Sequence, residues 1–448
     1  MNFAKERVAR CPSSWERKRI KHHISRFFGG GTPAKDNVNF WVDGTIPWVS
    51  SKDMKVARLT DTEDYITEAA LAGSSTSMVQ PGSVIIVVRS GILKHSIPVA
   101  INDVPVALNQ DLKAIELRRS LDRRFFQYWV TGQQKDLLLE WRQLGATVDS
   151  IDIDTLRNTV IPLPDLDTQK AIVYFLDRET ARIDALMEKK RLLLVAMEEK
   201  KKAFASEVST RGLNPAEKMQ ATGIGIVPEA PAHWEVMRVA RVFREVAEKG
   251  IDGLPVLSVS INWGISDKEL DDEDRHRVVN QIADKTSYKR IRPNDLVYNM
   301  MRAWQGGFGV SRMEGLVSPA YVVARPHREI HAAYYEHLLR TPMWIEEFRR
   351  VSKGIADFRQ RLYWEHFRMV PILVPPLREQ ERIASAIAAN NRRLDRVRQK
   401  VSESIDRLTE LRASLITAAV TGQIDPATYR RHGTTDRALE KIEAEMAP

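Results

Sequence analysis

Two glycine-bearing loops carry the side chains whose types best suit contact with a nucleic acid. Each loop follows an apolar run that begins after a proline turn, at Pro81 and at Pro293. The candidate side chains are basic, amide or aromatic: Arg89 and Lys94 in the first loop, and Asn299, Arg302, Trp304 and Gln305 in the second. Arginine and lysine match the major-groove acceptors of guanine, and asparagine and glutamine match adenine. The pattern favours base reading, although glycine loops with an arginine are also common surface turns.

Further loops add side chains that suit phosphate contacts. Their candidate residues carry hydroxyl or cationic groups: Thr32, Ser51, Lys52, Lys353, Arg359 and Arg361. Such groups usually position a protein on the phosphate backbone. Trp48 lies among them and could equally belong to the core, as aromatic residues of strand-rich domains usually do.

One spacing matches that of metal-dependent nucleases. Pro164-Asp165 is followed by Glu188 and Lys190. A metal site needs carboxylates that converge on one ion. Glu188 falls within a predicted helix, and about 23 residues of helical rise place it roughly 35 Å from Asp165. We therefore predict no metal site and no catalytic residue.

Other catalytic signatures are absent from the sequence. The triple glycine at positions 29–31 lacks the Gly-Lys-Ser/Thr of a phosphate-binding loop, and no dinucleotide or amino-methyltransferase motif is found. Four histidines lack the helical spacing of metal ligands and are expected at the surface: His22, His23, His331 and His337. The chain is predicted to hold no cofactor and to be no enzyme by itself.

The elements that position the candidate loops follow from an internal repeat. A shift of 211 positions superimposes residues 164–172 on residues 375–383, and matches proline, leucine, glutamine and isoleucine: Pro164, Leu166, Gln169 and Ile172 on Pro375, Leu377, Gln380 and Ile383. Each copy opens with the same short motif, Pro12-Ser-Ser-Trp15-Glu16 or Pro231-Ala-His-Trp234-Glu235. The order is therefore domain, helical segment, domain, helical segment.

Each helical segment predicts one long helix with an apolar seam. Residues 168–210 contain no proline or glycine, and apolar residues recur at spacings of three, four or seven. Glycine and proline follow each segment, at Gly212 and Pro215 and at Gly422 and Pro426. A rod of roughly 60 Å needs a partner. We expect the two helices to pair within the chain, antiparallel; a coiled coil between two chains is the alternative.

The predicted fold class is α+β: two α/β recognition domains separated by two long helices packed as an antiparallel coiled coil, with pseudo-twofold internal repetition. Short β-branched runs such as Val84–Val88 and Tyr321–Ala324 predict strands, and aromatic runs at Phe125–Trp129 and Tyr334–Leu339 predict short helices. The predicted boundaries are 1–162 and 214–373 for the domains, 163–213 and 374–426 for the helical spacers, and 427–448 for a polar tail, a short helix or disordered.

Composition agrees with a polyanionic partner. The chain has 68 Lys and Arg against 59 Asp and Glu, for a net charge of +9 and a pI near 9.4. No segment is long and apolar enough for a membrane span. Cys11 is the only cysteine, so no internal disulfide is possible, and a cytoplasmic location is expected.

These motifs resemble the specificity subunits of type I restriction-modification systems. The resemblance rests on the two Pro-x-x-Trp-Glu openings, on the helix starts that contain Gln169 and Gln380, and on the ending Thr-Gly-Gln-Ile-Asp425. It covers about residues 12–426. The first copy departs from the pattern at Thr210-Arg-Gly-Leu-Asn214, which leaves the helix ends less defined.

The resemblance implies a non-catalytic DNA-recognition subunit. Each domain is expected to read one half of a bipartite, asymmetric site in double-stranded DNA, and the helical pair to set the spacer and dock two methyltransferase (M) subunits. Restriction/translocase (R) subunits are also expected, with S-adenosylmethionine, ATP and magnesium on the partner subunits. The alternatives are a coiled-coil scaffold, a DNA-binding adaptor outside restriction, or a self-contained nuclease.

Overall fold

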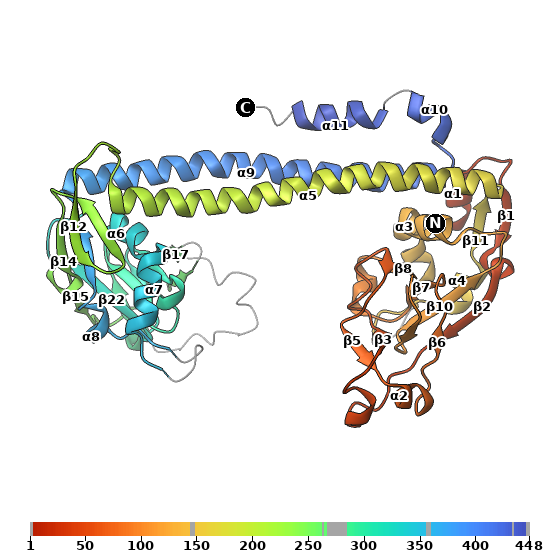
Figure 1. Cartoon of the computed structure of the whole chain (residues 1–448), viewed down its shortest axis with the longest axis horizontal. Helices are drawn as coiled ribbons and strands as arrows, with labels where there is room; N and C mark the ends of the chain where they lie inside the picture. Colours follow the sequence, from red (N-terminus) through yellow and green to blue (C-terminus); the bar gives the residue numbers. More distant parts are fainter. Residues whose placement is uncertain are drawn as a thin grey trace. The chain divides into compact units, whose positions relative to one another are not determined.

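The computed structural model of the chain describes residues 3–143, 148–261, 264–266, 285–354, 360–431 and 434–444. Its contacts divide the chain into two compact units: unit 1 holds Met1–Arg191 and Lys400–Pro448, and unit 2 holds Leu192–Gln399. Each unit combines one mixed domain with one half of each of two long helices, α5 (Leu166–Arg211) and α9 (Leu377–Val420) (Figure 1). The predicted fold class is confirmed.

The domain of unit 1 contains a five-stranded sheet, in the order β2-β10-β7-β8-β4, and a four-stranded sheet, in the order β5-β3-β9-β6. Its strands are β1 (Glu16–Arg19), β2 (Ile24–Gly29), β3 (Ile46–Val49), β4 (Arg58–Leu59), β5 (Asp64–Ile66), β6 (Met78–Val79), β7 (Val84–Val87), β8 (Val99–Asn102), β9 (Val106–Leu108), β10 (Leu112–Leu117) and β11 (Val160–Leu163). Its helices are α1 (Phe3–Ala9), α2 (Glu68–Ala72), α3 (Arg123–Trp141) and α4 (Ile153–Asn158), with short 3-10 turns η1 (Ile20–His23), η2 (Val38–Phe40) and η3 (Gly91–Lys94).

The core of this domain forms where the five-stranded sheet meets α3. All four residues of β7 are buried, as β-branched residues on a central strand usually are. Asp122 caps α3 by accepting hydrogen bonds from the backbone N–H groups of residues 124 and 125 at 2.8 and 3.0 Å. The helix buries Phe125, Trp129 and Trp141. It has 19 residues, longer than the short helix predicted, because its apolar face continues past Trp129.

The domain of unit 2 repeats this plan with smaller sheets. Its strands are β12 (Met219–Ile224), β13 (Val227–Pro231), β14 (Glu235–Arg238), β15 (Phe243–Val246), β16 (Ser258–Ser260), β17 (Gly264–Ser266), β18 (Lys289–Ile291), β19 (Leu296–Asn299), β20 (Phe308–Val310), β21 (Gly315–Val317), β22 (Tyr321–Pro326) and β23 (Pro371–Val374). Its helices are α6 (Ala332–Leu339), α7 (Pro342–Val351) and α8 (Trp364–Phe367), with 3-10 turns η4 (Val239–Arg241), η6 (Lys285–Ser287) and η7 (Ala303–Gln305).

Sheet topology shows that the internal repeat extends through the domains. In unit 1, four strands of the larger sheet run in the order β2-β10-β7-β8, and in unit 2 the order is β15-β22-β19-β20. Every one of these neighbouring pairs is antiparallel. The first and last strands of each domain also pair, β1 with β11 and β14 with β23. The two domains therefore share one connectivity although their loop sequences differ.

The ends of the long helices follow ordinary capping rules. Asp165 stands before α5, and its carboxylate accepts hydrogen bonds from the backbone N–H groups of Asp167 and Thr168 at 3.0 and 2.9 Å. Gly212 and Gly422 follow α5 and α9 with φ angles of +78° and +70°. Glycine adopts this left-handed conformation without steric cost, so both helices end there.

The two long helices pair antiparallel within the chain. In unit 1, Arg412 donates to Asp184 at 2.8 and 3.2 Å, and the Thr409 hydroxyl lies 3.6 Å from the sulfur of Met187. A step of three residues forward on α5 thus matches three residues backward on α9. In unit 2, Lys201 pairs with Asp395 at 2.5 Å. Most of the apolar seam is buried within one chain, as at Ile183 and Leu408, although Leu193 and Val397 are 46% and 42% exposed.

A repeated glutamine joins each long helix to its domain. Gln169 and Gln380 are both buried, at 1% and 2% exposure. Gln169 accepts a hydrogen bond from the N–H of Asp122 at 2.8 Å and donates to the carbonyl of Pro164 at 2.9 Å. Gln380 accepts from the N–H of His331 at 2.9 Å and donates to the carbonyl of Pro375 at 2.7 Å. Gln169 also donates to the carbonyl of Ser120 at 3.3 Å. Each amide therefore satisfies backbone groups on both sides of the junction.

The repeated proline-tryptophan openings lie against the glycines that end the long helices. A Cβ atom on Gly422 would meet Pro12 at 2.6 Å and Trp15 at 2.9 Å. In unit 2, a Cβ on Gly212 would lie 3.5 Å from Trp234 and 3.7 Å from Pro231. The same motif therefore packs against the end of a long helix in both units, and the distances are shorter in unit 1.

The C-terminal tail is more ordered than predicted. It forms α10 (Pro426–Arg431) and α11 (Thr434–Ala444), which pack on the core of unit 1. The ring of Tyr429 meets that of Phe175 edge-on at 5.1 Å, and Arg182 donates to Asp436. The apolar positions Leu439 and Ile442 share one face of α11 and are partly buried against the core. The sequence analysis missed this amphipathic spacing because most residues of the tail are polar.

Tyr429→Ala is expected to lower the free energy of unfolding of unit 1 by about 1–2 kcal/mol, because the ring is half-buried against Phe175. Asp436→Ala, which removes an exposed ion pair in the same tail, should cost under about 1 kcal/mol. Chemical denaturation measures both. Equal losses for the two variants would show that the ring contact does not hold the tail.

Candidate nucleic-acid interface

The predicted loops of unit 1 meet at one end of its two sheets. The C-terminal ends of β2, β3, β7 and β9 and the start of β10 all lie there, as their registers require. Three backbone hydrogen bonds bring their loops onto the turn Asn109–Asp111: Gly31 N–H to Leu108 O at 2.9 Å, Asn109 N–H to Val49 O at 3.0 Å, and Val88 N–H to Asp111 O at 2.8 Å. Loops that are distant in sequence therefore form one surface.

Arg89 leaves β7 on this surface and is held by one carboxylate. Its side chain is 54% exposed, and Nε donates to Asp111 Oδ1 at 2.7 Å. The backbone N–H of Arg89 also contacts the carbonyl of Asp111, at 3.3 Å. A guanidinium held through Nε can still present its terminal nitrogens as a two-pronged donor.

Thr32 reaches the same turn because of the glycines that precede it. A Cβ on Gly30 would lie 1.8 Å from the carbonyl oxygen of Leu108, so only glycine permits this close approach. The Thr32 hydroxyl donates to the side-chain oxygen of Gln110. The triple glycine thus positions a polar contact and is not a phosphate cradle.

The other candidates of unit 1 lie in turns around this surface. The Ser50 hydroxyl and N–H donate to Asp53 at 2.9 and 2.8 Å, which fixes the turn that carries Ser51 and the exposed Lys52. Lys94 ends η3 and is exposed. Trp48 is 6% exposed and donates to the carbonyl of Gly31 at 3.2 Å. It therefore belongs to the core, the alternative that the sequence had left open.

In unit 2 the corresponding loop follows β19. Asn299 is 9% exposed, and its side-chain oxygen accepts from the N–H of Met301 at 3.0 Å, so it shapes the turn. Arg302 is half-buried and Gln305 is exposed. Trp304 donates from Nε1 to the carbonyl of Met301 at 2.9 Å, and the guanidinium of Arg349 lies over its ring at 5.8 Å. The loop therefore presents an aromatic face and an amide.

The second predicted loop of unit 2 adjoins the first. Lys353 and Arg361 are exposed and exchange two backbone hydrogen bonds, at 3.0 and 2.9 Å. The next residue, Leu362, donates its N–H to the carbonyl of Met300 at 2.9 Å. Arg359 lies outside the described residues. The loops of Thr32, Lys52 and Arg89 are thus brought together in unit 1, and the loops of Arg302 and Arg361 in unit 2.

Gln110 and Asp111 are members of this surface that the sequence analysis missed. Both lie in a three-residue polar turn between two buried strands, β9 and β10. Neither carries a positive charge, and the turn lacks glycine, the two features used to select candidate loops. A search for short polar turns between buried β-runs could have found them.

The nuclease-like spacing forms no site. Asp165 is the cap of α5, and the backbone N–H of Thr168 lowers the pKa of its carboxyl group. Glu188 lies far along the helix and pairs with Arg191. Within the part of the chain that the structure describes, no three potential metal ligands gather.

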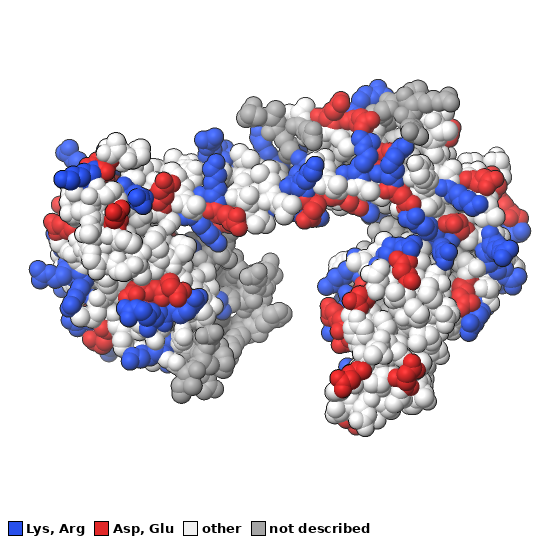
Figure 2. Space-filling model, in the orientation of Figure 1, with Lys and Arg blue, Asp and Glu red and all other residues white. Residues whose placement is uncertain are grey.

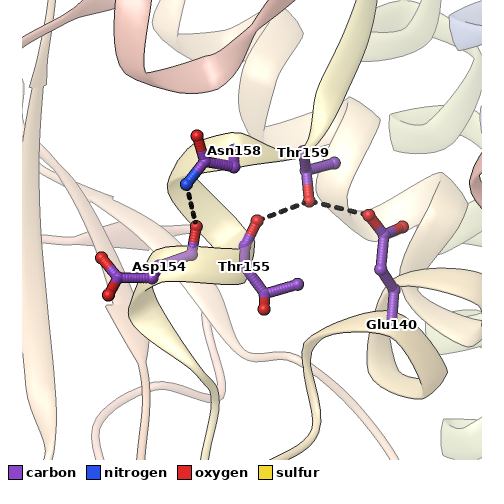
Figure 3. A pocket seen from close by; sticks show the side chains of 5 residues that line it. All are labelled: Glu140, Asp154, Thr155, Asn158 and Thr159. Carbon is purple, nitrogen blue, oxygen red and sulfur yellow. Dashed lines mark hydrogen bonds between the residues drawn. The ribbon is translucent and has the colours of Figure 1, made fainter.

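A small polar pocket between α3 and α4 satisfies its own hydrogen bonds (Figure 3). The Thr159 hydroxyl bonds to Glu140 at 3.0 Å and to the carbonyl of Thr155 at 2.9 Å. Asn158 donates to the carbonyl of Asp154, whose carboxylate points away from the other labelled side chains. The pocket therefore offers no converging reactive groups.

The expectation that the histidines lie at the surface was wrong for two of them. His23 is 2% exposed, bonds to the Ser120 hydroxyl at 2.8 Å, and has its pKa lowered by burial. His337 is half-buried in α6, and burial lowers its pKa to about 4. Neither pattern could be read from spacing, because both environments come from non-local packing.

Charge on the surface is mixed. On the face drawn in Figure 2, Lys and Arg lie beside Asp and Glu over both the helices and the domain of each unit. Several Lys and Arg side chains of the described residues form ion pairs, as Arg26 does with Glu116 and Arg58 with Asp103. On that face, no single large basic patch marks the candidate interfaces. No helix among the described residues could cross a membrane.

Comparison with known proteins agrees with this architecture of two domains and paired long helices. Residues 12–194 match the family "Type I restriction modification DNA specificity domain". The chain is 38% identical over 165 residues to the EcoR124I/EcoR124II specificity subunit of Escherichia coli, an alignment that covers 37% of this chain and 41% of that relative's length. It is 23% identical over 368 residues to the EcoBI specificity subunit of Escherichia coli, covering 77% and 76%.

A solved structure shares the fold over almost the whole chain. A chain from a structure of the type I R-M system, described for its complex assembly and conformational transition, superimposes with a TM-score of 0.65 at 16% identity, covering 92% of this chain and 99% of its own. Two repeated domains on a pair of long helices are thus an architecture known in this class of system. The chain therefore resembles the specificity subunits of type I restriction-modification systems, and its residues 12–194 match their DNA specificity domain.

Proposed function

We propose that this chain is the DNA sequence-recognition subunit of a type I restriction-modification complex. Each domain reads one half of a bipartite, asymmetric site in double-stranded DNA, and the pair α5 and α9 sets the spacer between the halves. The observation that carries the proposal is the convergence, in each unit separately, of basic and amide side chains from several loops. Base-edge readers supported by a backbone-positioning rim are the usual division of labour in DNA recognition.

The difference between the two domains supports an asymmetric site. Their sheets share one connectivity, but the loops that follow β7 and β19 differ in composition: Arg89 and Lys94 in one, Arg302, Trp304 and Gln305 in the other. Two domains with the same sheet connectivity and different loops are expected to recognise different DNA sequences.

The proposed partners carry the chemistry. Two methyltransferase subunits dock on the helical pair and bind S-adenosylmethionine, and restriction subunits supply ATP- and magnesium-dependent cleavage. The chain itself is proposed to be non-catalytic and to hold no cofactor. Its acidic side chains serve as helix caps and ion-pair partners, as Asp165 and Asp184 do.

Arg89→Ala is expected to relax discrimination at one base position of one half-site, at a cost of about 1–3 kcal/mol, and Arg302→Ala should do the same in the other half-site. Each arginine belongs to a loop of only one domain, so each is proposed to contact a base edge in only one half-site. Competition binding with duplexes that carry single substitutions measures the effect. Binding of all duplexes should fall steeply with salt, because phosphate contacts supply much of the affinity.

Matched controls remove an exposed arginine elsewhere in the same domain. Arg26→Ala in unit 1 and Arg368→Ala in unit 2 each lose one surface ion pair and should leave discrimination unchanged. If Arg89→Ala or Arg302→Ala weakened every duplex equally, that arginine would contact phosphate and not a base. A wild-type chain without sequence preference in the assembled complex would reject the proposed function.

A further inference from the structure

We infer that Gln110 reads a base in the half-site of the first domain, and that Thr32 and Asp111 are positioning residues for Gln110 and Arg89. The inference rests on the proposed function. It goes beyond that function by assigning roles to residues of a turn that contains no cationic side chain and no glycine. The turn Asn109–Asp111 is where the loops of unit 1 meet. Its central residue, Gln110, is exposed.

The backbone of this turn is held rigidly. Asn109 is 7% exposed, and its side-chain oxygen accepts the N–H of Asp111 at 3.0 Å. The strands on either side, β9 and β10, are paired in different sheets. A reading side chain is most selective when its support does not move. Gln110 therefore projects from a fixed point at the end of both sheets.

Thr32 orients the amide of Gln110. The Thr32 hydroxyl donates to Oε1, which leaves both N–H donors of Nε2 and one lone pair of Oε1 for other partners. An amide oriented in this way can donate to N7 of a purine in the major groove. Because the glycines at 29–31 bring Thr32 to the turn, the contact is built into the fold.

Asp111 positions Arg89 through both its side chain and its backbone. Its carboxylate accepts from Arg89 Nε at 2.7 Å, and its carbonyl accepts from Val88 at 2.8 Å. The terminal nitrogens of Arg89 make no hydrogen bond to a described residue, so they can pair with O6 and N7 of a guanine. Two adjacent positions of one turn thus control two reading side chains.

The second domain keeps the turn but not these side chains. The corresponding turn, between β21 and β22, also has three residues, and Ser318 Oγ accepts the N–H of Ala320 at 3.3 Å, as Asn109 does for Asp111. Pro319 stands in place of Gln110, and Ala320 in place of Asp111. The paired arrangement is therefore confined to unit 1, and its loss should affect one half-site only.

The test uses the full chain in its assembled methyltransferase complex. Competition binding compares the cognate duplex with duplexes that carry single base substitutions in either half-site, and with duplexes in which single purines are replaced by 7-deazapurines. Gln110→Ala is expected to lose about tenfold discrimination at one purine of the first domain's half-site, the range of one good base contact. The 7-deaza replacement at that purine should weaken the wild type and leave Gln110→Ala unaffected.

Thr32 provides a conservative comparison. Thr32→Val should lose about threefold to fivefold discrimination at the same purine, whereas Thr32→Ser keeps the hydroxyl and should behave as the wild type. Gln305→Ala serves as the matched amide variant, since its effect should fall in the other half-site. Discrimination ratios do not depend on the fraction of folded protein, so a loss of stability cannot imitate this pattern.

Three outcomes would overturn the inference while leaving the proposed function standing. They are full discrimination by Gln110→Ala, an equal loss on every duplex, or a Thr32→Ser variant as impaired as Thr32→Val. A wild-type complex that binds all duplexes alike, at moderate salt, would instead reject the proposed function and this inference with it.

Discussion

Inserting one heptad into each long helix is expected to lengthen the spacer between the two half-sites by about three base pairs and to leave both half-site sequences unchanged. Seven residues add about 10 Å of helix, and base pairs stack at about 3.4 Å. The insertion points are Leu194, seven residues after Met187, and Ser402, seven residues before Thr409, its contact on α9. A heptad preserves the apolar seam, so both helices remain paired.

Sequencing of methylated adenines in a host that carries the variant measures the new spacing. The control is the removal of one heptad at the same two points, which should shorten the spacer by the same amount. An unchanged spacer in both variants would contradict the proposal that the paired helices measure distance. A change in half-site sequence would contradict the assignment of base reading to the domains.

Gln380→Ala is expected to destabilise unit 2 by about 2–4 kcal/mol. The amide satisfies the N–H of His331 and the carbonyl of Pro375, and the side chain is 2% exposed, so alanine leaves buried polar groups without partners. Each such group costs about 1–3 kcal/mol. Chemical denaturation, followed by the tryptophan fluorescence of the chain, measures the loss.

The repeat offers a matched variant in the other unit. Gln169→Ala removes the corresponding contacts, together with the bond to the carbonyl of Ser120, and should destabilise unit 1 by a similar amount. Thr168→Ala, at the exposed neighbouring position, should cost under about 1 kcal/mol because its hydroxyl bonds only to Asp165 at the surface. If the two glutamine variants were as stable as the wild type, the repeated residue would have no structural role.

The parts of the fold that sequence predicts best are those with local causes. The seam of α5 and α9 repeats every three or four residues, and caps such as Asp165 and Gly422 mark where the helices begin and end. The internal repeat then fixes the order of domains and helices without any long-range information. The strands at Val84 and Tyr321 were found for the same reason, because β-branched runs carry their own signal.

The parts that sequence could not predict depend on strand register. Thr32, Val49 and Arg89 reach the turn Asn109–Asp111 only because β3 runs parallel to β9 and β10 pairs with both β2 and β7. Nothing in a local window specifies such pairings. The burial of His23 and the packing of the tail have the same origin. The sequence therefore identified candidate residues in separate loops, but it did not show that these loops form one surface.

Unit 2 is one continuous stretch of chain, whereas unit 1 needs both ends of it. During synthesis, α5 emerges with its first domain long before residues 400–444 can cover it. At about 5–20 residues per second, the 209 residues from Leu192 to Lys400 take roughly 10–40 s to be made. In that interval Met187 of α5 lacks its contact with Thr409 of α9, and the core of unit 1 lacks the α9 residues Leu408 and Leu415; a chain that stops early never gains them. The ribosome thus makes the second part of unit 1 only after the whole of unit 2, and nascent chains should depend on chaperones until that part is made.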